Sequence, residues 1–420
     1  LIYWLAFFIV AVLFVLFLPV ILDSWINLST MDDDLAYHVL LILGPTALLA
    51  IPKSFLSSIC IGLQRMDINN SVDIILVVIQ QLGMITLLIN HCDILGVAYW
   101  LGGVNILKVS VYLFFATRLL SLNALLPWFS LGVIKRVKQY TSKMMWISLV
   151  LVVHKQLDKV LVSKFLPIGI FGIYSFVYTS IGRTSMVTGA VTQAVFPYFS
   201  ALDSNSNGKE IRERFLILQD FLVFGTIPIF ISVIFFSAPL FTFVLDAEKA
   251  ETLQIPVIFL SISFYLSAIL RLSRIYMFAI SKPEPILKSD VMSLFIVIPS
   301  TIFLVYNMGI NGAAFSWVIF YGVLAFLIVP GVYKREFDLS PYIWFRSVIL
   351  AVSLALIIYV PAWLFALTIL PDNIFTLVMF FVLASILYGV ISLNMTGVKF
   401  QQALINYLPG LQFLVININK

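Results

Sequence analysis

The residues of this chain that could do chemistry lie in an unusual place. The stretch SLVLVVHKQLDKVLVSKFLP, residues 148–167, is apolar enough to cross a bilayer, yet its centre carries His154, Lys155, Asp158 and Lys159. An ionisable side chain at mid-membrane depth costs about 2.5 to 3.5 kcal/mol on insertion scales, so such groups usually face a bundle interior or a wet cavity. The stretch therefore either does not span a membrane or lines something polar.

The composition of the chain decides between these two interpretations. Of the 420 residues, 62% are hydrophobic and 11% are charged, whereas soluble domains contain about 25% charged residues. A membrane helix needs about 20 apolar residues, and the sequence contains twelve such runs. They lie approximately at residues 2–22, 36–61, 72–90, 96–117, 146–166, 170–198, 215–240, 254–281, 288–308, 311–333, 347–370 and 373–394. The runs are too long for the strands of a transmembrane barrel, so we expect an all-α polytopic membrane protein.

The charged residues separate between alternate loops. One set of loops holds most of the cations, among them Arg65, Lys135, Lys209 and Lys334, whereas the opposite set is acidic and holds Lys249 alone. Short loops rich in Lys and Arg stay in the cytoplasm, which predicts a multi-pass protein with a cytoplasmic C-terminus. The net charge of +5 is therefore a topology signal, and we expect no nucleic-acid partner.

Metal and nucleotide chemistry find no support in the sequence. Cys60 and Cys92 are expected near opposite ends of the spans, too far apart for a disulfide. The three histidines, His38, His91 and His154, are scattered along the chain, so no metal site is predicted. No glycine-rich phosphate loop is present, and we expect no cofactor.

A weak internal repeat organises the spans. Three pairs of residues recur at offsets of 216, 217 and 218: Gly96 with Gly312, Asp73 with Asp290, and Lys53 with Arg271. Weak sequence symmetry of this kind is common in transporters, and it predicts two tandem bundles of the same orientation. The first four spans match the seventh to the tenth, so we expect that two spans, on the order of 70 to 80 residues, precede Leu1 in the natural protein.

The repeat also predicts the domain organisation. We expect an incomplete N-terminal bundle of four spans over residues 1–118 and a C-terminal bundle of six spans over residues 144–333. Residues 119–143, which mix apolar and basic side chains, are expected to lie along the cytoplasmic surface as the linker. Residues 334–420 are expected to form a C-terminal helix pair and a cytoplasmic tail.

Cations within the spans outnumber acids. The deep cations are Lys53, Lys108, Lys155, Lys159, Arg183, Arg271 and Arg274. Asp158 is interpreted as the one acid near mid-membrane, because Asp73 and Asp290 lie close to helix starts, where a carboxylate is stabilised by free N–H groups and the helix dipole. A cationic interior favours an anion such as a diphosphate, which Arg binds bidentately and Lys binds as a point charge. The structural alternative for each cation is snorkelling to the interface or helix pairing.

The opening stretch has a polar and an apolar side. At 100° per residue, Asp158, Lys155 and Gln156 fall on one arc, and Leu157, Val160 and Leu161 fall opposite. With His154, Asp158 forms the one pair expected to titrate if transport is coupled to a proton or ion gradient. The alternative is that His154 and Lys155 neutralise Asp158 and clasp two helices together.

Several longer stretches resemble one known family. They are GLQRMDINN at 62–70, QLDKVLVSKFLPIGIFGIYSFVYT at 156–179, VFPYFSAL at 195–202 and INGAAFSWVI at 310–319. These stretches are similar to the polysaccharide flippases, the O-antigen and capsule repeat-unit transporters of the multidrug/oligosaccharidyl-lipid/polysaccharide exporter superfamily. The resemblance covers nearly the whole chain, up to the two C-terminal spans.

The resemblance carries expectations about fold and activity. It implies two six-helix bundles around a central cavity, with two extra helices at the C-terminal end. It also implies a transporter of the bacterial inner membrane, which moves an undecaprenyl-diphosphate-linked oligosaccharide from the cytoplasmic to the periplasmic leaflet during polysaccharide or lipopolysaccharide biosynthesis. Membrane lipids, a polysaccharide polymerase and a chain-length regulator are the implied partners.

Two other functions were weighed against a flippase. A multidrug exporter of the same superfamily would bind organic cations, for which an acidic cavity is expected. An O-antigen polymerase or ligase would need a large periplasmic loop with catalytic residues, and the longest outer loops in the sequence are only about a dozen residues, judged from the predicted span lengths. We therefore expect a transporter and not an enzyme.

Overall fold

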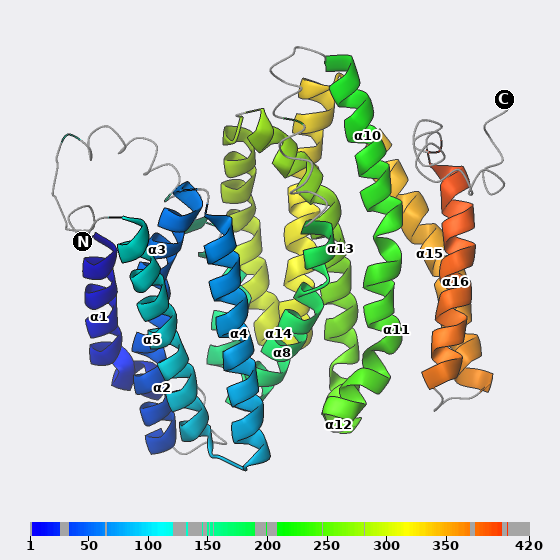
Figure 1. Cartoon of the computed structure of the whole chain (residues 1–420). Helices are drawn as coiled ribbons and strands as arrows, with labels where there is room; N and C mark the ends of the chain where they lie inside the picture. Colours follow the sequence, from blue (N-terminus) through cyan, green and yellow to red (C-terminus); the bar gives the residue numbers. More distant parts are fainter. Residues whose placement is uncertain are drawn as a thin grey trace. The chain divides into compact units, whose positions relative to one another are not determined.

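The computed structural model describes most of the chain. The described residues are 2–25, 33–63, 65–120, 155–189, 208–245, 247–280, 282–369 and 374–396, with residues 132, 145, 149, 150, 152, 153, 199 and 401. The chain divides into two compact units, residues 1–143 with 167–169 and residues 144–166 with 170–420. In the described parts of both units the regular secondary structure is helical (Figure 1), so the predicted all-α polytopic fold is confirmed.

The first unit is a bundle of apolar helices. They are α1 (Ile2–Ser24), α2 (Asp33–Leu48), α3 (Ala50–Gly62), α4 (Met66–Ile89) and α5 (Ile94–Leu119). The span predicted at 36–61 is formed by α2 and α3, which meet at Leu49 just before Pro52, because proline removes a helical hydrogen bond. Asp93 caps α5 by accepting a hydrogen bond of 2.9 Å from the Gly96 amide. The bundle thereby fixes α3, α4 and α5 against one another, and these three helices carry the polar groups described below.

The second unit packs around one central helix. It contains most of α8 (Ile168–Gly182), followed by α10 (Gly208–Gly225), α11 (Ile227–Val244), α12 (Ala247–Thr252), α13 (Gln254–Ala279), α14 (Glu284–Pro330), the π-helix η1 (Gly331–Glu336), α15 (Tyr342–Ile369) and α16 (Ile374–Met395). Helix α13 contacts α10, α11 and α14, and its side chains belong to one continuous hydrophobic core. Helices α15 and α16 pack on each other and on α11.

Helix α14 is a hairpin of two antiparallel arms. At Gly309 the backbone adopts φ 56° and ψ −131°, a conformation that glycine tolerates best. Thr301 and Ser316 line the same small cavity, so the arms 284–308 and 310–330 run side by side. The spans predicted at 288–308 and 311–333 are these two arms.

Nine helices in the described part of the chain are long and apolar enough to span a membrane. The sequence predicted twelve spans. The numbers differ because the two arms of α14 and η1 count as one helical stretch, Glu284–Glu336, and because the spans predicted at 146–166 and 170–198 lie partly outside the described residues. The protein is a multi-pass membrane protein. Most of the predicted linker and tail, with His154, lies outside the described residues and remains a prediction.

The close approach of the two arms of the hairpin requires a glycine at position 312. A Cβ at this position would clash with the backbone carbonyl of Leu304 on the other arm, whereas nothing lies within 4 Å of a Cβ built at Gly322. Gly312→Ala should therefore destabilise the protein by about 1 to 3 kcal/mol, as overpacking does. Gly322→Ala is the matched control. Thermal unfolding followed by size-exclusion chromatography would compare them, and equal stability of the two variants would contradict the hairpin contact.

Candidate functional site

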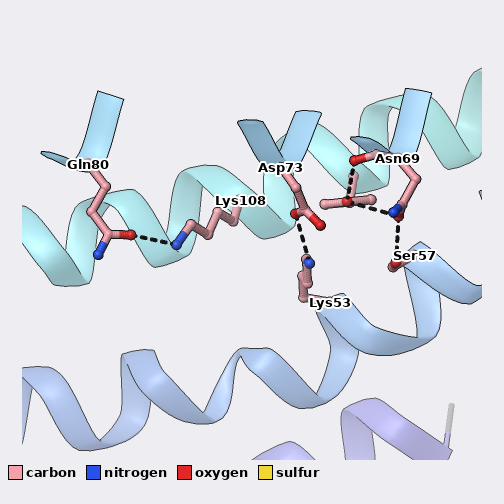
Figure 2. Close-up of polar contacts among 7 residues, drawn as sticks. Lys53, Ser57, Asn69, Asp73, Gln80 and Lys108 are labelled. Carbon is pink, nitrogen blue, oxygen red and sulfur yellow. Dashed lines mark hydrogen bonds and ion pairs between the residues drawn. The ribbon is translucent and has the colours of Figure 1, made fainter. Parts of the chain in front are cut away.

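Polar side chains from three helices meet inside the first unit. Asn69, Asp73 and Gln80 are spaced by four and seven residues, which places them on one face of α4. Figure 2 shows this face with side chains of α3 and α5 directed toward it. We call the set the polar ladder; its members are Lys53, Ser57, Asn69, Asp73, Gln80, Lys108 and Tyr112.

Most of the polar ladder is internally satisfied. The Lys53 Nζ atom lies 2.9 Å from Asp73 Oδ1 and 4.8 Å from the centre of the Tyr112 ring. Asn69 Oδ1 accepts hydrogen bonds from Ser57 Oγ at 2.6 Å and from the Tyr112 hydroxyl at 3.0 Å. The charge of Lys53 is therefore neutralised by a carboxylate, and the hydroxyls at this end of the ladder share the Asn69 amide oxygen as acceptor.

Lys108 differs from Lys53 because its partner is neutral. Its Nζ atom donates to the Gln80 Oε1 atom at 2.7 Å (Figure 2). Trp100 Nε1 donates to the Gln80 backbone carbonyl at 3.2 Å, and its ring covers Gly83, where any Cβ would clash with it. The half-buried ammonium group of Lys108 is thus held by a hydrogen bond to a neutral amide.

The second unit contains an equivalent ion pair. Arg274 on α13 grips Asp290 on α14 with two hydrogen bonds of 2.8 and 2.7 Å, and the Asp290 side chain is 2% exposed. Asp73 and Asp290 are therefore both ion-paired to the preceding helix, which differs from the helix-start role inferred from the sequence. Arg274, and not Arg271, occupies the role that Lys53 has in the first unit.

Arg271 lies one turn before Arg274 and has no such partner. No described carboxylate lies within ion-pairing distance of its half-buried guanidinium group. A Cβ at Gly189 would lie 2.9 Å from an Arg271 Nη atom, so the small residue leaves room for the guanidinium. Lys108 and Arg271 are thus partly buried cations that have no ion pair with a carboxylate in the described part of the chain.

Asp158 is buried under aromatic hydrogen-bond donors. Its side chain is 2% exposed, and Oδ2 accepts from the Tyr174 hydroxyl at 2.6 Å and from Trp317 Nε1 at 2.9 Å. Among the described residues Oδ1 has no hydrogen-bond partner. A cavity of about 10 Å³, close to the space that one water needs, adjoins the carboxylate and is also lined by Thr301 and Ser316.

This arrangement corrects the division of the opening stretch into a polar and an apolar side. Asp158 is buried together with Leu161 and Val162, whereas Val160 is exposed. A carboxylate can share a face with aliphatic side chains when donors satisfy it. Lys155 is exposed, and no ion pair joins it to Asp158 among the described residues, so the clasp between these two side chains is absent there.

The remaining predicted cations lie elsewhere in the second unit. The Lys159 ammonium lies 4.1 Å from the centre of the Tyr178 ring, a cation–π contact. Arg183 is exposed just after the end of α8.

The sequence analysis did not predict Gln80, Tyr174 and Trp317 as site residues. The signal for Trp317 was its indole within the INGAAFSWVI stretch, because a buried N–H donor requires an acceptor. Within the described residues no cluster of His, Cys, Asp or Glu could hold a metal ion.

Comparison with known proteins identifies the family. A family model described as "Polysaccharide biosynthesis protein" matches residues 2–252. A solved structure, "Lipid II flippase MurJ, inward closed conformation", superposes with a TM-score of 0.70 over 96% of this chain and 82% of that chain, at 15% sequence identity. No curated protein matches. The structural likeness shows that this chain shares the fold of that structure, and the family match over more than half of the sequence shows that the chain belongs to the polysaccharide biosynthesis protein family.

Proposed function

We propose that this protein moves an undecaprenyl-diphosphate-linked oligosaccharide repeat unit from the cytoplasmic to the periplasmic leaflet of the bacterial inner membrane by alternating access. The family and the MurJ-like fold support a flippase. The observation that carries the substrate class is that Lys108 and Arg271, both half-buried, have no carboxylate partner among the described residues. A diphosphate would supply each of these cations with the negatively charged partner that no described carboxylate provides.

The cost of an uncompensated cation supports this assignment. A charge within a membrane helix bundle is expensive and is normally paired. An Arg side chain such as that of Arg271 can bind two phosphate oxygens at once, and a Lys side chain such as that of Lys108 binds a phosphate as a point charge. Lys53 and Arg274 are held by carboxylates, so we assign them to helix pairing. Lys155, Lys159 and Arg183 remain candidates for further contacts with the anionic head group. A drug exporter that binds organic cations is not favoured by these positive charges.

We further propose that Asp158 couples transport to a proton or ion gradient. Its Oδ1 atom is without a hydrogen-bond partner among the described residues and adjoins a cavity with room for one water. A free carboxylate oxygen beside space for a water can take up a proton or an ion, and carboxylates inside membrane bundles form proton relays in pumps and transporters. His154 is the second titratable group of this proposal. The proposed function also includes a cytoplasmic C-terminus and association with a polymerase and a chain-length regulator.

Removal of either uncompensated cation tests the substrate assignment. Arg271→Ala and Lys108→Ala should each slow flipping of the lipid-linked repeat unit in proteoliposomes by about 10- to 100-fold, the range expected for the loss of a hydrogen bond to a charged group. Arg271→Lys should retain part of the activity if the grip is bidentate. The exposed Lys288 supplies the control, since Lys288→Ala should flip normally. Wild-type rates in both cation variants would remove these residues from the substrate path.

A substitution at Asp158 separates coupling from folding. In Asp158→Asn the amide oxygen can still accept from Tyr174 and Trp317, so the protein should fold and flip substrate without responding to an imposed gradient. Asp158→Leu should instead lower the protein level, because an unsatisfied buried donor costs about 1 to 3 kcal/mol. Transport is measured with and without a pH or sodium gradient across the liposome membrane. A wild-type gradient response in Asp158→Asn would end the coupling assignment.

A further inference from the structure

The two units share one polar element and differ in the rest. Each unit contains an ion pair between consecutive helices, Lys53 with Asp73 on α3 and α4, and Arg274 with Asp290 on α13 and α14. The acids recur at an offset of 217 residues, and α5 matches the second arm of α14 at an offset of 216. The repeat therefore allows every other position of the polar ladder to be compared with its counterpart in the second unit.

Four further members of the polar ladder have counterparts that are apolar and buried. Gln80 and Lys108 correspond to Val297 and Leu324, which are 5% and 1% exposed. Asn69 and Tyr112 correspond to Ile286 and Ile328, at 2% and 3% exposed. The same helical scaffold thus packs without polar side chains at these four positions. Because polar groups inside a membrane bundle are costly, the fold alone does not explain the pair of Gln80 and Lys108.

The hydrogen-bond partner of Lys108 is an amide, that of Gln80, and not a carboxylate. A carboxylate at position 80 would bind an ammonium more strongly than an amide does, and Asp73 provides that stronger partner for Lys53 two turns away on the same helix. The amide of Gln80 instead holds the ammonium at 2.7 Å without neutralising it. Trp100 bonds the Gln80 backbone carbonyl from α5, which fixes the turn of α4 that carries the amide.

We propose that Gln80 is a positioning residue that holds the Lys108 side chain in place and preserves its charge for a phosphate-type anion. A lysine ammonium has three donors; Gln80 takes one, and two remain for phosphate oxygens. The proposal rests on the proposed function, because it takes Lys108 to contact the diphosphate of a lipid-linked substrate. It adds Gln80 to the site: with a neutral amide at this position Lys108 can bind an anion, whereas a carboxylate there would form an ordinary ion pair with Lys108.

The test compares two probes that differ only in charge. Geranylgeranyl diphosphate and geranylgeraniol are titrated into the purified full chain in lipid nanodiscs. Gln80→Glu should weaken diphosphate binding by about 10- to 100-fold, the range for loss of a charge-assisted contact, and leave alcohol binding unchanged. Gln80→Met removes the acceptor but not the lysine charge, so its loss should be smaller. Gln81→Glu, on the exposed side of α4, adds the same charge away from Lys108 and should bind as wild type.

The outcomes separate a positioning role from a structural one. Diphosphate affinity that falls in the order wild type, Gln80→Met, Gln80→Glu, with constant alcohol affinity, supports the proposal. Equal losses for both probes, or wild-type affinity in Gln80→Glu, would overturn it. If Gln80→Glu folds poorly, Gln80→Met decides, because unchanged diphosphate affinity in that variant overturns the positioning role. A wild-type protein that binds both probes equally would instead refute the proposed function, and this inference with it.

Discussion

A charge inside a lipid-embedded helix bundle must be compensated, and the polar architecture of both units follows from this constraint. Lys53 and Arg274 meet carboxylates on the next helix at 2.9 and 2.7 Å. These contacts tie α3 to α4 and α13 to α14. Asp158 is compensated differently, by a phenol and an indole that donate to one of its oxygens. The Asp290 side chain is 2% exposed, and breaking a buried pair costs about 3 to 5 kcal/mol, so the pair of Arg274 and Asp290 fixes how α13 and α14 are rotated against each other.

The exceptions to compensation are the two groups that we propose as substrate contacts. Lys108 has an amide for a partner, and Arg271 has no carboxylate within reach among the described residues. Both are half-buried, and Arg271 lies one turn before the paired Arg274 on the same helix. A site that binds an anion reversibly needs cations in this state, since a carboxylate would occupy the donors permanently. In the proposed function, the paired cations therefore belong to the scaffold and the other two contact the substrate.

The internal repeat shows which polar groups are required by the fold. The ion pair occurs in both units, although its cation is Lys in one and Arg in the other. The positions of Gln80 and Lys108 hold Val297 and Leu324 in the second unit. One repeat thus serves as an internal control for the other. The common pair ties two consecutive helices together in each unit, and Gln80 and Lys108, found in one copy alone, are the residues to which we assign the specialised role.

The sequence by itself determined the class of the protein and the layout of its helices. Span length follows from bilayer thickness, so the twelve apolar runs and the turn near Gly309 could be predicted, as could the family from its motifs. The sequence also predicted a set of deep cations, but it did not separate paired from unpaired ones, and Lys155 and Arg183 are exposed. Only the tertiary structure brought Trp317 to Asp158, 159 residues away, and Gln80 to Lys108. Such contacts depend on how each helix is rotated against its neighbours, and that rotation is set by packing across the bundle, which the periodicity of a single helix does not contain.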